Sequence, residues 1–215
     1  LNTVSWFIEE FIDQEVGLVI KTNVANNSVS DYLRTEAKLK EVLANYKDRK
    51  CKIYLLHGDL TAGQMSSLYL NEKINALINI SHGEGFGLPM FEAAREGLPI
   101  ITVGWSGQRD FLVVDGEDCF QNVKYDLKPV QPEAVWPGVI EKESEWAFAE
   151  QGSYKMKLRE MYKENDRFKS QAKKLKRWIL KNFDQEKQYD CFNNNIKEFI
   201  SSGDWMDDLD AIELI

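Results

Sequence analysis

The chain of 215 residues is 43% hydrophobic and 29% charged, which is the composition of a globular protein long enough to bury its own core. No apolar run approaches the roughly 18 residues of a membrane-spanning helix, and the N-terminus lacks a signal-peptide pattern, so we expect a cytoplasmic protein. The three cysteines are widely spaced and form no C-x-x-C pair, which argues against a zinc or redox motif.

Short apolar runs alternate with helical patterns through the first half of the chain. The expected helices cover residues 4–12, 31–46, 62–71 and 89–96, and Asp31 is expected to cap the second. The expected strands cover residues 17–21, 53–56, 76–80 and 100–103. This alternation predicts an α/β fold with a Rossmann-like parallel β-sheet flanked by helices.

In open parallel sheets, ligands bind beyond the carboxyl ends of the strands. Four loops hold that place in this chain: 21–22, 57–59, 81–88 and 104–107. Any binding site is therefore expected among them.

The pattern weakens from about residue 124 to 145, where three prolines predict a loop. Helices are expected again over 153–163, 166–182 and 185–200. We expect a Rossmann-like domain over 1–182, followed by a C-terminal helix and acidic tail over 183–215. The tail holds Asp208-Leu209-Asp210, an Asp-x-Asp pattern that lies away from any strand end, so it is not expected to bind a metal.

The net charge of −8 is unevenly distributed. Residues 155–181 hold eleven Lys or Arg and three acids, a local charge of +8, so the remainder carries −16. A solvated basic helical face is the favoured interpretation, with peripheral contact to an anionic membrane as the alternative. Nucleic acid is not an expected partner, because the remaining surface would repel it.

The segment 81–92 is the part of the sequence that points to chemistry. Gly83, Gly85 and Gly87 would let a ligand approach the backbone, and Pro89 suits the first turn of a helix. Leu88, just before it, is a poor cap, so the first helical amides are expected to lack a side-chain acceptor. An anion such as a diphosphate would satisfy them.

Two carboxylates accompany this loop. Glu84 lies within it, and Glu92 is expected in the first turn of the helix, where each could accept hydrogen bonds from a pair of sugar hydroxyls. Two purely structural alternatives stay open: Glu92 only complements the helix dipole, and the glycines only form a tight turn. A G-x-G-x-x-G dinucleotide motif is disfavoured, because the third glycine comes one position early and the loop follows the third strand.

The segment resembles the C-terminal domain of retaining GT-B glycosyltransferases. The similarity lies in Glu84-Gly85-Phe86-Gly87-Leu88-Pro89 followed by Glu92-Ala93-Ala94, and it continues through Gly97-Leu98-Pro99-Ile100-Ile101, Gly107 and Asp110. Weaker similarity extends from the first helix to about residue 195.

This resemblance implies a donor-binding domain that holds a nucleotide-diphosphate sugar for transfer with retention of configuration, without a metal or a cofactor. Glu84 would contact the reacting sugar, and Glu92 would bind the ribose. The implied donor-binding residues are Ser81, His82, Gly85, Phe86, Gly87, Leu88 and Glu92. The acceptor domain of the family is expected to lie outside this chain or on a partner chain. The alternatives are a non-catalytic nucleotide-sugar-binding or interaction domain and an epimerase-like GT-B enzyme.

Overall fold

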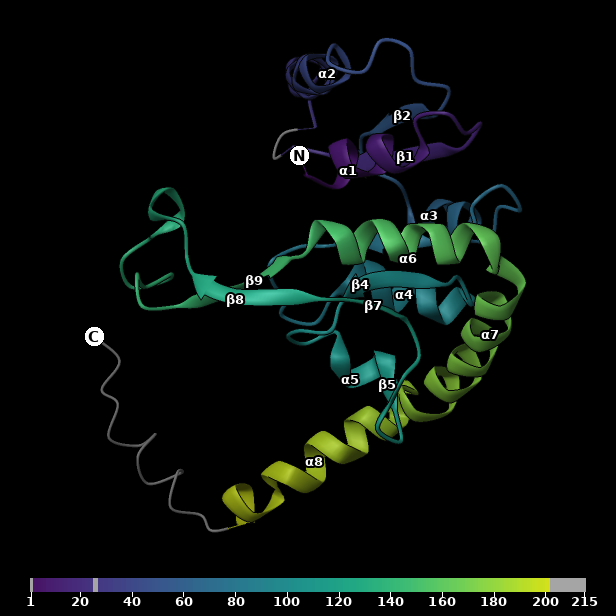
Figure 1. Ribbon diagram of the computed structural model, residues 1–215. Helices are drawn as coiled ribbons and strands as arrows, with labels where there is room; N and C mark the ends of the chain where they lie inside the picture. Colours follow the sequence, from purple (N-terminus) through teal and green to yellow (C-terminus); the bar gives the residue numbers. More distant parts are fainter. Residues whose placement is uncertain (1, 25–26, 202–215) are drawn as a thin grey trace. The chain divides into compact units, whose positions relative to one another are not determined.

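The computed structural model describes residues 2–24 and 27–201 (Figure 1). The chain divides into two compact units, Leu1–Lys176 and Arg177–Ile215, and each is considered by itself. The acidic tail, with Trp205, Met206 and the Asp208-Leu209-Asp210 pattern, lies outside the described residues. Within the described part, no helix combines the length and the apolarity needed to span a bilayer.

The helices and strands predicted for the first half of the chain are all present, and the α/β fold class is confirmed. The helices are α1 (Asn2–Phe11), α2 (Val29–Leu43), α3 (Ala62–Tyr69) and α4 (Leu88–Glu96). The strands are β1 (Gly17–Thr22), β2 (Lys52–His57), β3 (Leu77–Asn79) and β4 (Ile100–Val103).

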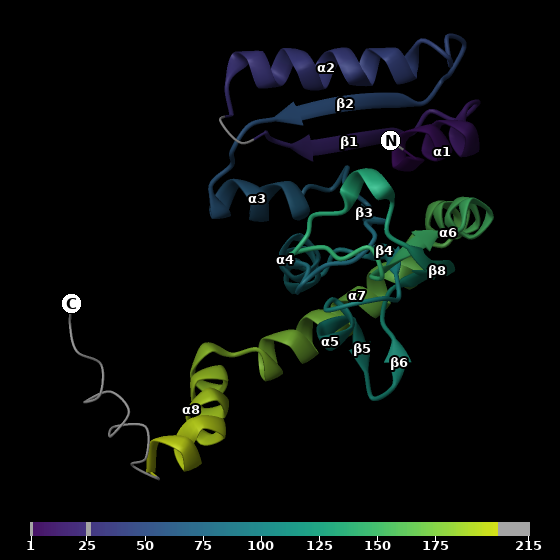
Figure 2. The ribbon, with the colours of Figure 1, turned by 90° about the vertical axis from the view of Figure 1, so that its left-hand side faces the viewer.

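The parallel strands form two sheets rather than the single sheet expected. One sheet is the pair β1–β2, which runs side by side in the same direction (Figure 2). The other has the order β3–β4–β7, where β7 (Gln121–Val123) was not predicted. Its sequence, Gln-Asn-Val, carries too little apolar character to be recognised as a strand.

The second half contains a short helix, two small antiparallel sheets and three longer helices. These elements are α5 (Arg109–Leu112), β5 (Val113–Val114), β6 (Glu117–Asp118), β8 (Tyr125–Pro129), η1 (Pro132–Ala134), β9 (Glu145–Ala149), α6 (Gln151–Lys163), α7 (Asn165–Asn182) and α8 (Gln185–Ser201). The predicted helices are confirmed.

The loop predicted from about 124 to 145 was wrong at its N-terminal end, where β8 lies, and β9, which begins where the loop was expected to end, was not predicted. The two strands pair as an antiparallel hairpin (Figure 1). Most of β8 is exposed on both faces. A strand without a buried face has no apolar alternation, so its main-chain pairing leaves no pattern in the sequence.

Helix α1 forms one wall of the main core. Its buried residues are Val4, Phe7, Ile8 and Phe11, at the three- and four-residue spacing of one helical face. They belong to a cluster that includes Val103 of β4, Val123 of β7, and Tyr154, Leu158 and Met161 of α6. Burying each large apolar side chain contributes about 1.5–3 kcal/mol.

The N-cap of α2 is Ser28 and not Asp31, which corrects the sequence-based prediction. The Ser28 hydroxyl accepts from the Asp31 amide at 3.2 Å, and the Asp31 carboxylate accepts from the Ser28 amide at 3.1 Å. This reciprocal capping box explains why an acid three residues into the helix suggested a cap. The helix also ends at Leu43, three residues before the predicted end at Tyr46.

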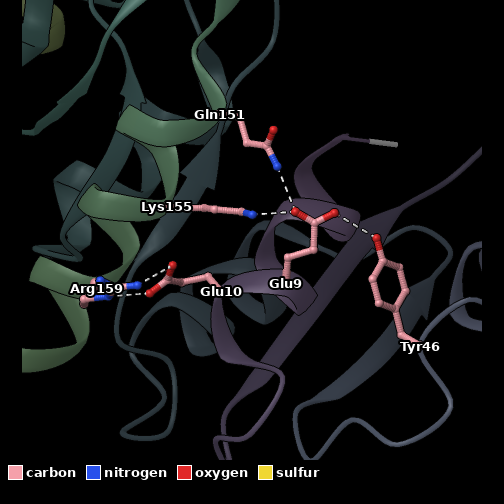
Figure 3. A network of polar contacts seen from close by, with 6 residues as sticks. All are labelled: Glu9, Glu10, Tyr46, Gln151, Lys155 and Arg159. Atoms are coloured by element: carbon pink, nitrogen blue, oxygen red, sulfur yellow. Dashed lines mark hydrogen bonds and ion pairs between the residues drawn. The ribbon is translucent and has the colours of Figure 1, made fainter.

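A polar network on the outer side of α1 connects this helix to α6 and to Tyr46 (Figure 3). The Glu9 carboxylate accepts from Lys155, from the Gln151 amide at 2.7 Å and from the Tyr46 hydroxyl at 3.0 Å. The hydrogen bond from Lys155 is the main reason that the pKa of Glu9 is lowered. The pKa of Tyr46 is raised, first by burial and then by its bond to Glu9.

The basic segment 155–181 forms ion pairs within the fold and is not only a solvated face. Arg159 donates two hydrogen bonds to Glu10, at 2.6 and 2.9 Å, and the Glu10 side chain is only 6% exposed. In the described part of the chain, further ion pairs of this segment are Lys155–Glu9, Lys157–Glu160, Arg167–Glu164 and Lys176–Glu96. Part of its positive charge is thus used within the fold.

The Glu9 network predicts a pH-dependent contribution to stability. Because the pKa of Glu9 is lowered from its ordinary 4.5, its charged form stabilises the fold above that pH, and this contribution is lost as the pH falls through the lowered pKa. Glu9→Gln should therefore unfold at lower urea concentration than the native chain near neutral pH, and the difference should shrink below pH 4.5. Glu15→Gln, at an exposed position, is the matched control. A difference that stays constant on acidification would contradict this prediction.

Candidate functional site

The loops that follow β3 and β4 are joined through the main chain of Glu84. The Gly107 amide donates to the Glu84 carbonyl at 3.0 Å, and the Ser106 hydroxyl donates to the same carbonyl at 2.8 Å. The strands themselves pair in parallel with Asn79 opposite Thr102, so both loops leave the same edge of the sheet. The structure thus brings together two of the four loops expected to carry a site.

Two glycines make this arrangement possible. A Cβ at Gly107 would lie 1.9 Å from the Gly85 carbonyl oxygen, a distance that no side chain allows. Gly87 has a φ of +88°, and a Cβ there would lie 2.8 Å from the terminal methyl of Met90. The loop therefore requires glycine at both positions for steric and conformational reasons.

The N-terminus of α4 has no side-chain cap, as predicted. The N-cap residue is Gly87 rather than Leu88, and it accepts the first helical hydrogen bonds through its carbonyl. No described residue accepts a hydrogen bond from the amides of Gly85, Gly87 or Leu88. Such amides carry partial positive charge and suit an anionic ligand.

The Glu84 carboxylate is held by one of its two oxygens. Oε1 accepts from the Asn79 amide at 2.9 Å and from the Ser81 hydroxyl at 2.9 Å. Asn79 also accepts from the Ser81 amide at 2.8 Å, so the three residues form a closed set of hydrogen bonds. The other oxygen, Oε2, has no partner among the described residues and is available to a ligand.

Glu92 lies in the second turn of α4, not in the first turn where it was expected. Its carboxylate accepts from the hydroxyl of Tyr69, on α3, at 3.5 Å. Burial of Tyr69 and the nearby Glu92 charge raise the pKa of the phenol to about 12. Tyr69 is therefore a protonated donor at neutral pH. Glu92 lies beyond the first turn of α4, the turn in which the interaction with the helix dipole is strongest.

His82 is tied to the β8–β9 hairpin. Its Nδ1 lies 2.8 Å from the Ala147 carbonyl, and the Ala147 amide donates to the His82 carbonyl at 3.1 Å. The imidazole stacks on Trp146, with centroids 5.3 Å apart, and contacts Phe148 at 4.4 Å. His82 is thus packed and hydrogen-bonded at one end of the loop.

Phe86 and Leu88 have different surroundings. The Phe86 ring packs against Phe91 and Phe111, with centroids 5.2 and 5.0 Å away. Its side chain therefore anchors the loop. Leu88 is 58% exposed, although it begins α4.

The loops after β1 and β2 form a second pair. The Gly58 amide donates to the Thr22 carbonyl at 3.1 Å. The Asp59 carboxylate accepts from the side-chain amides of Asn23, at 2.6 Å, and Asn27, at 3.2 Å. No cluster of three metal-binding side chains is found among the described residues.

Sequence reasoning missed three residues that hold the candidate site together: Asn79, Tyr69 and Ser106. Asn79 had a usable signal, because it is a polar residue at the carboxyl end of an apolar strand. Ser106 lies in the loop 104–107, which was expected near a site, although its bond to the Glu84 carbonyl was not predicted. Tyr69 had no signal, since it acts through a contact between distant parts of the chain.

No protein-family model matches this chain, and neither does any curated protein. Among solved structures, the chain is similar to the crystal structure of the pneumococcal O-GlcNAc transferase GtfA in complex with UDP and GlcNAc. The two share 19% identity with a TM-score of 0.48, over 86% of this chain and 36% of that chain.

The close approach of Gly107 to Gly85 makes a direct prediction. Gly107→Ala should lower the free energy of unfolding by about 1–3 kcal/mol or more, because the added methyl must displace the loop. Gly152→Ala, in α6 with open space around it, should change stability by less than about 1 kcal/mol. Urea unfolding of both variants measures the effect, and equal midpoints would contradict the observed packing.

Proposed function

We propose that this chain binds a nucleoside diphosphate sugar at the 81–92 segment and supplies the donor site of a retaining glycosyltransferase. The observation that carries the proposal is the combination of uncapped amides at the start of α4 with two carboxylates held by neighbouring side chains.

The diphosphate is assigned to the main chain of residues 85–88. The amides of Gly85, Gly87 and Leu88 have no acceptor among the described residues, and α4 adds the positive end of its dipole. As the bond to the sugar breaks, negative charge grows on the diphosphate. Amides already in place stabilise that charge without reorganisation.

The two carboxylates are assigned to the two sugars of the donor. Glu84, with Oε1 occupied by Asn79 and Ser81, offers Oε2 to hydroxyls of the transferred sugar. Glu92, steadied by Tyr69, accepts from the ribose hydroxyls. Carboxylates suit this work because they accept hydrogen bonds and donate none.

The acceptor is expected to bind to a further domain or partner chain, as in the glycosyltransferases that the loop resembles. The chain spans 36% of the transferase to which it is structurally similar, so transfer itself is proposed only for the complete assembly. Donor binding, in contrast, is assigned to this chain alone.

A thermal-shift panel of UDP, GDP, ADP and their sugars tests the proposal. A ligand at a hundredfold its Kd stabilises the fold by about 2.7 kcal/mol, which raises the Tm by roughly 5–10 °C for a chain of this size. The responding nucleotide also identifies the base. No shift with any member of the panel would refute donor binding.

Glu92→Gln should weaken binding of the responding nucleotide by about tenfold or more, because charge-assisted hydrogen bonds to the ribose are lost. The 2′-deoxy nucleotide should bind the variant and the native chain more equally. Glu96→Gln is the control, since Glu96 lies on the same helix but is engaged by Ser66 and Lys176. Unchanged affinity in Glu92→Gln would remove this residue from the site.

A further inference from the structure

The base of the β8–β9 hairpin contacts both loops of the candidate site. On β8, the Tyr125 ring lies 6.0 Å from that of Trp105, and its hydroxyl reaches the Gly104 carbonyl at 3.5 Å. On β9, residues 146–148 contact His82. The hairpin therefore packs against the loops that follow β3 and β4.

The contact with His82 fixes both its main chain and its ring. The main chain bonds to Ala147 as a neighbouring strand would, with the Ala147 amide donating to the His82 carbonyl. The ring lies nearly parallel to that of Trp146, at an interplanar angle of 12°, and Phe148 touches it from a second direction. A ring held in this way has little rotational freedom.

The hydrogen bond also sets the position of the proton on the imidazole. A carbonyl oxygen can only accept, so the Nδ1 atom facing Ala147 must carry a hydrogen. In the neutral ring, Nε2 is then an acceptor, and no described residue donates to it. Nε2 is not buried, so it is open to solvent or to a ligand.

We propose that the hairpin is a positioning element that holds His82 so that its Nε2 accepts a hydroxyl of the transferred sugar. This inference rests on the proposed function. An acceptor nitrogen two residues before Glu84 matches a neutral hydroxyl and not a phosphate oxygen. His82 would therefore recognise the sugar and leave the affinity for the nucleoside diphosphate unchanged, with Trp146 and Phe148 acting through it.

The test compares two dissociation constants, for the nucleoside diphosphate and for its sugar ester, by calorimetry. The ligand pairs are UDP with UDP-glucose and UDP-N-acetylglucosamine, GDP with GDP-mannose, and ADP with ADP-glucose. His82→Asn keeps a donor near the Nδ1 position and removes Nε2. It should weaken binding of the sugar ester by about 2- to 12-fold, the range for one hydrogen bond, and leave the diphosphate within about twofold.

Hairpin variants test the positioning role. Trp146→Ala should reduce affinity for the sugar ester as His82→Asn does, and Trp146→Phe should restore it by keeping an aromatic ring beside His82. Trp136→Ala is the matched control, because Trp136 lies in the loop of the same hairpin and is 64% exposed. Circular dichroism of each variant shows whether it is folded.

The tautomer of His82 can be measured directly by NMR. The chain has two histidines, so ¹⁵N spectra of the imidazoles are simple, and His82→Asn assigns them. A proton on Nδ1 of His82 in the native chain, with a shift toward mixed tautomers in Trp146→Ala, supports the proposal. A proton on Nε2 overturns it.

Failure of the proposed function and failure of the positioning role give different results. If no nucleoside diphosphate binds, the proposed function fails and this inference with it. If a diphosphate binds but His82→Asn and Trp146→Ala leave the sugar ester's affinity unchanged, the function stands and the positioning role is refuted.

Discussion

The contact between Gly107 and the main chain at Glu84 and Gly85 is the constraint on which the candidate site depends. It brings the loop after β4 against the loop after β3, and only a residue without a side chain fits there. Because Glu84 is held from its carbonyl, its carboxylate can be oriented by Asn79 and Ser81. The amides at the start of α4 follow immediately, since Gly87 takes the left-handed conformation that begins the helix.

The helices and strands around these loops hold them in place through buried side chains and hydrogen bonds. Helix α4 is anchored by Met90, Ala93 and Ala94, which are fully buried. The hairpin contacts both loops through Tyr125 and residues 146–148. Its strand β9 leads directly into α6, which is joined to α1 by the Glu9 and Glu10 networks (Figure 3). Packed and hydrogen-bonded surroundings of this kind favour a preorganised site over one that forms around a ligand.

Sequence reasoning succeeded where local patterns determine structure. The strands β1 to β4 have apolar runs, and the glycine loop carries its own steric signature, so both were predicted. It failed at β7 and β8, where polar or exposed residues leave no periodicity and pairing between distant segments decides the structure. Strand β9, Glu-Trp-Ala-Phe-Ala, is mostly apolar and was missed because its pairing with β8 is not visible in the sequence. Glu84 and Glu92 could be proposed as site residues because they belong to the local loop pattern. Of their partners, Asn79 had the signal of a polar residue at a strand end, whereas Tyr69 had none, because its contact with Glu92 joins distant parts of the chain.

The most direct measurement of the central claim is a ¹⁵N–¹H titration of the chain with the nucleoside diphosphate that stabilises it. If the diphosphate binds at the start of α4, the amide signals of Gly85 and Gly87 shift strongly and saturably, while that of Gly152 in α6 stays in place. Saturable shifts confined to other parts of the chain, with Gly85 and Gly87 unmoved, would contradict the account.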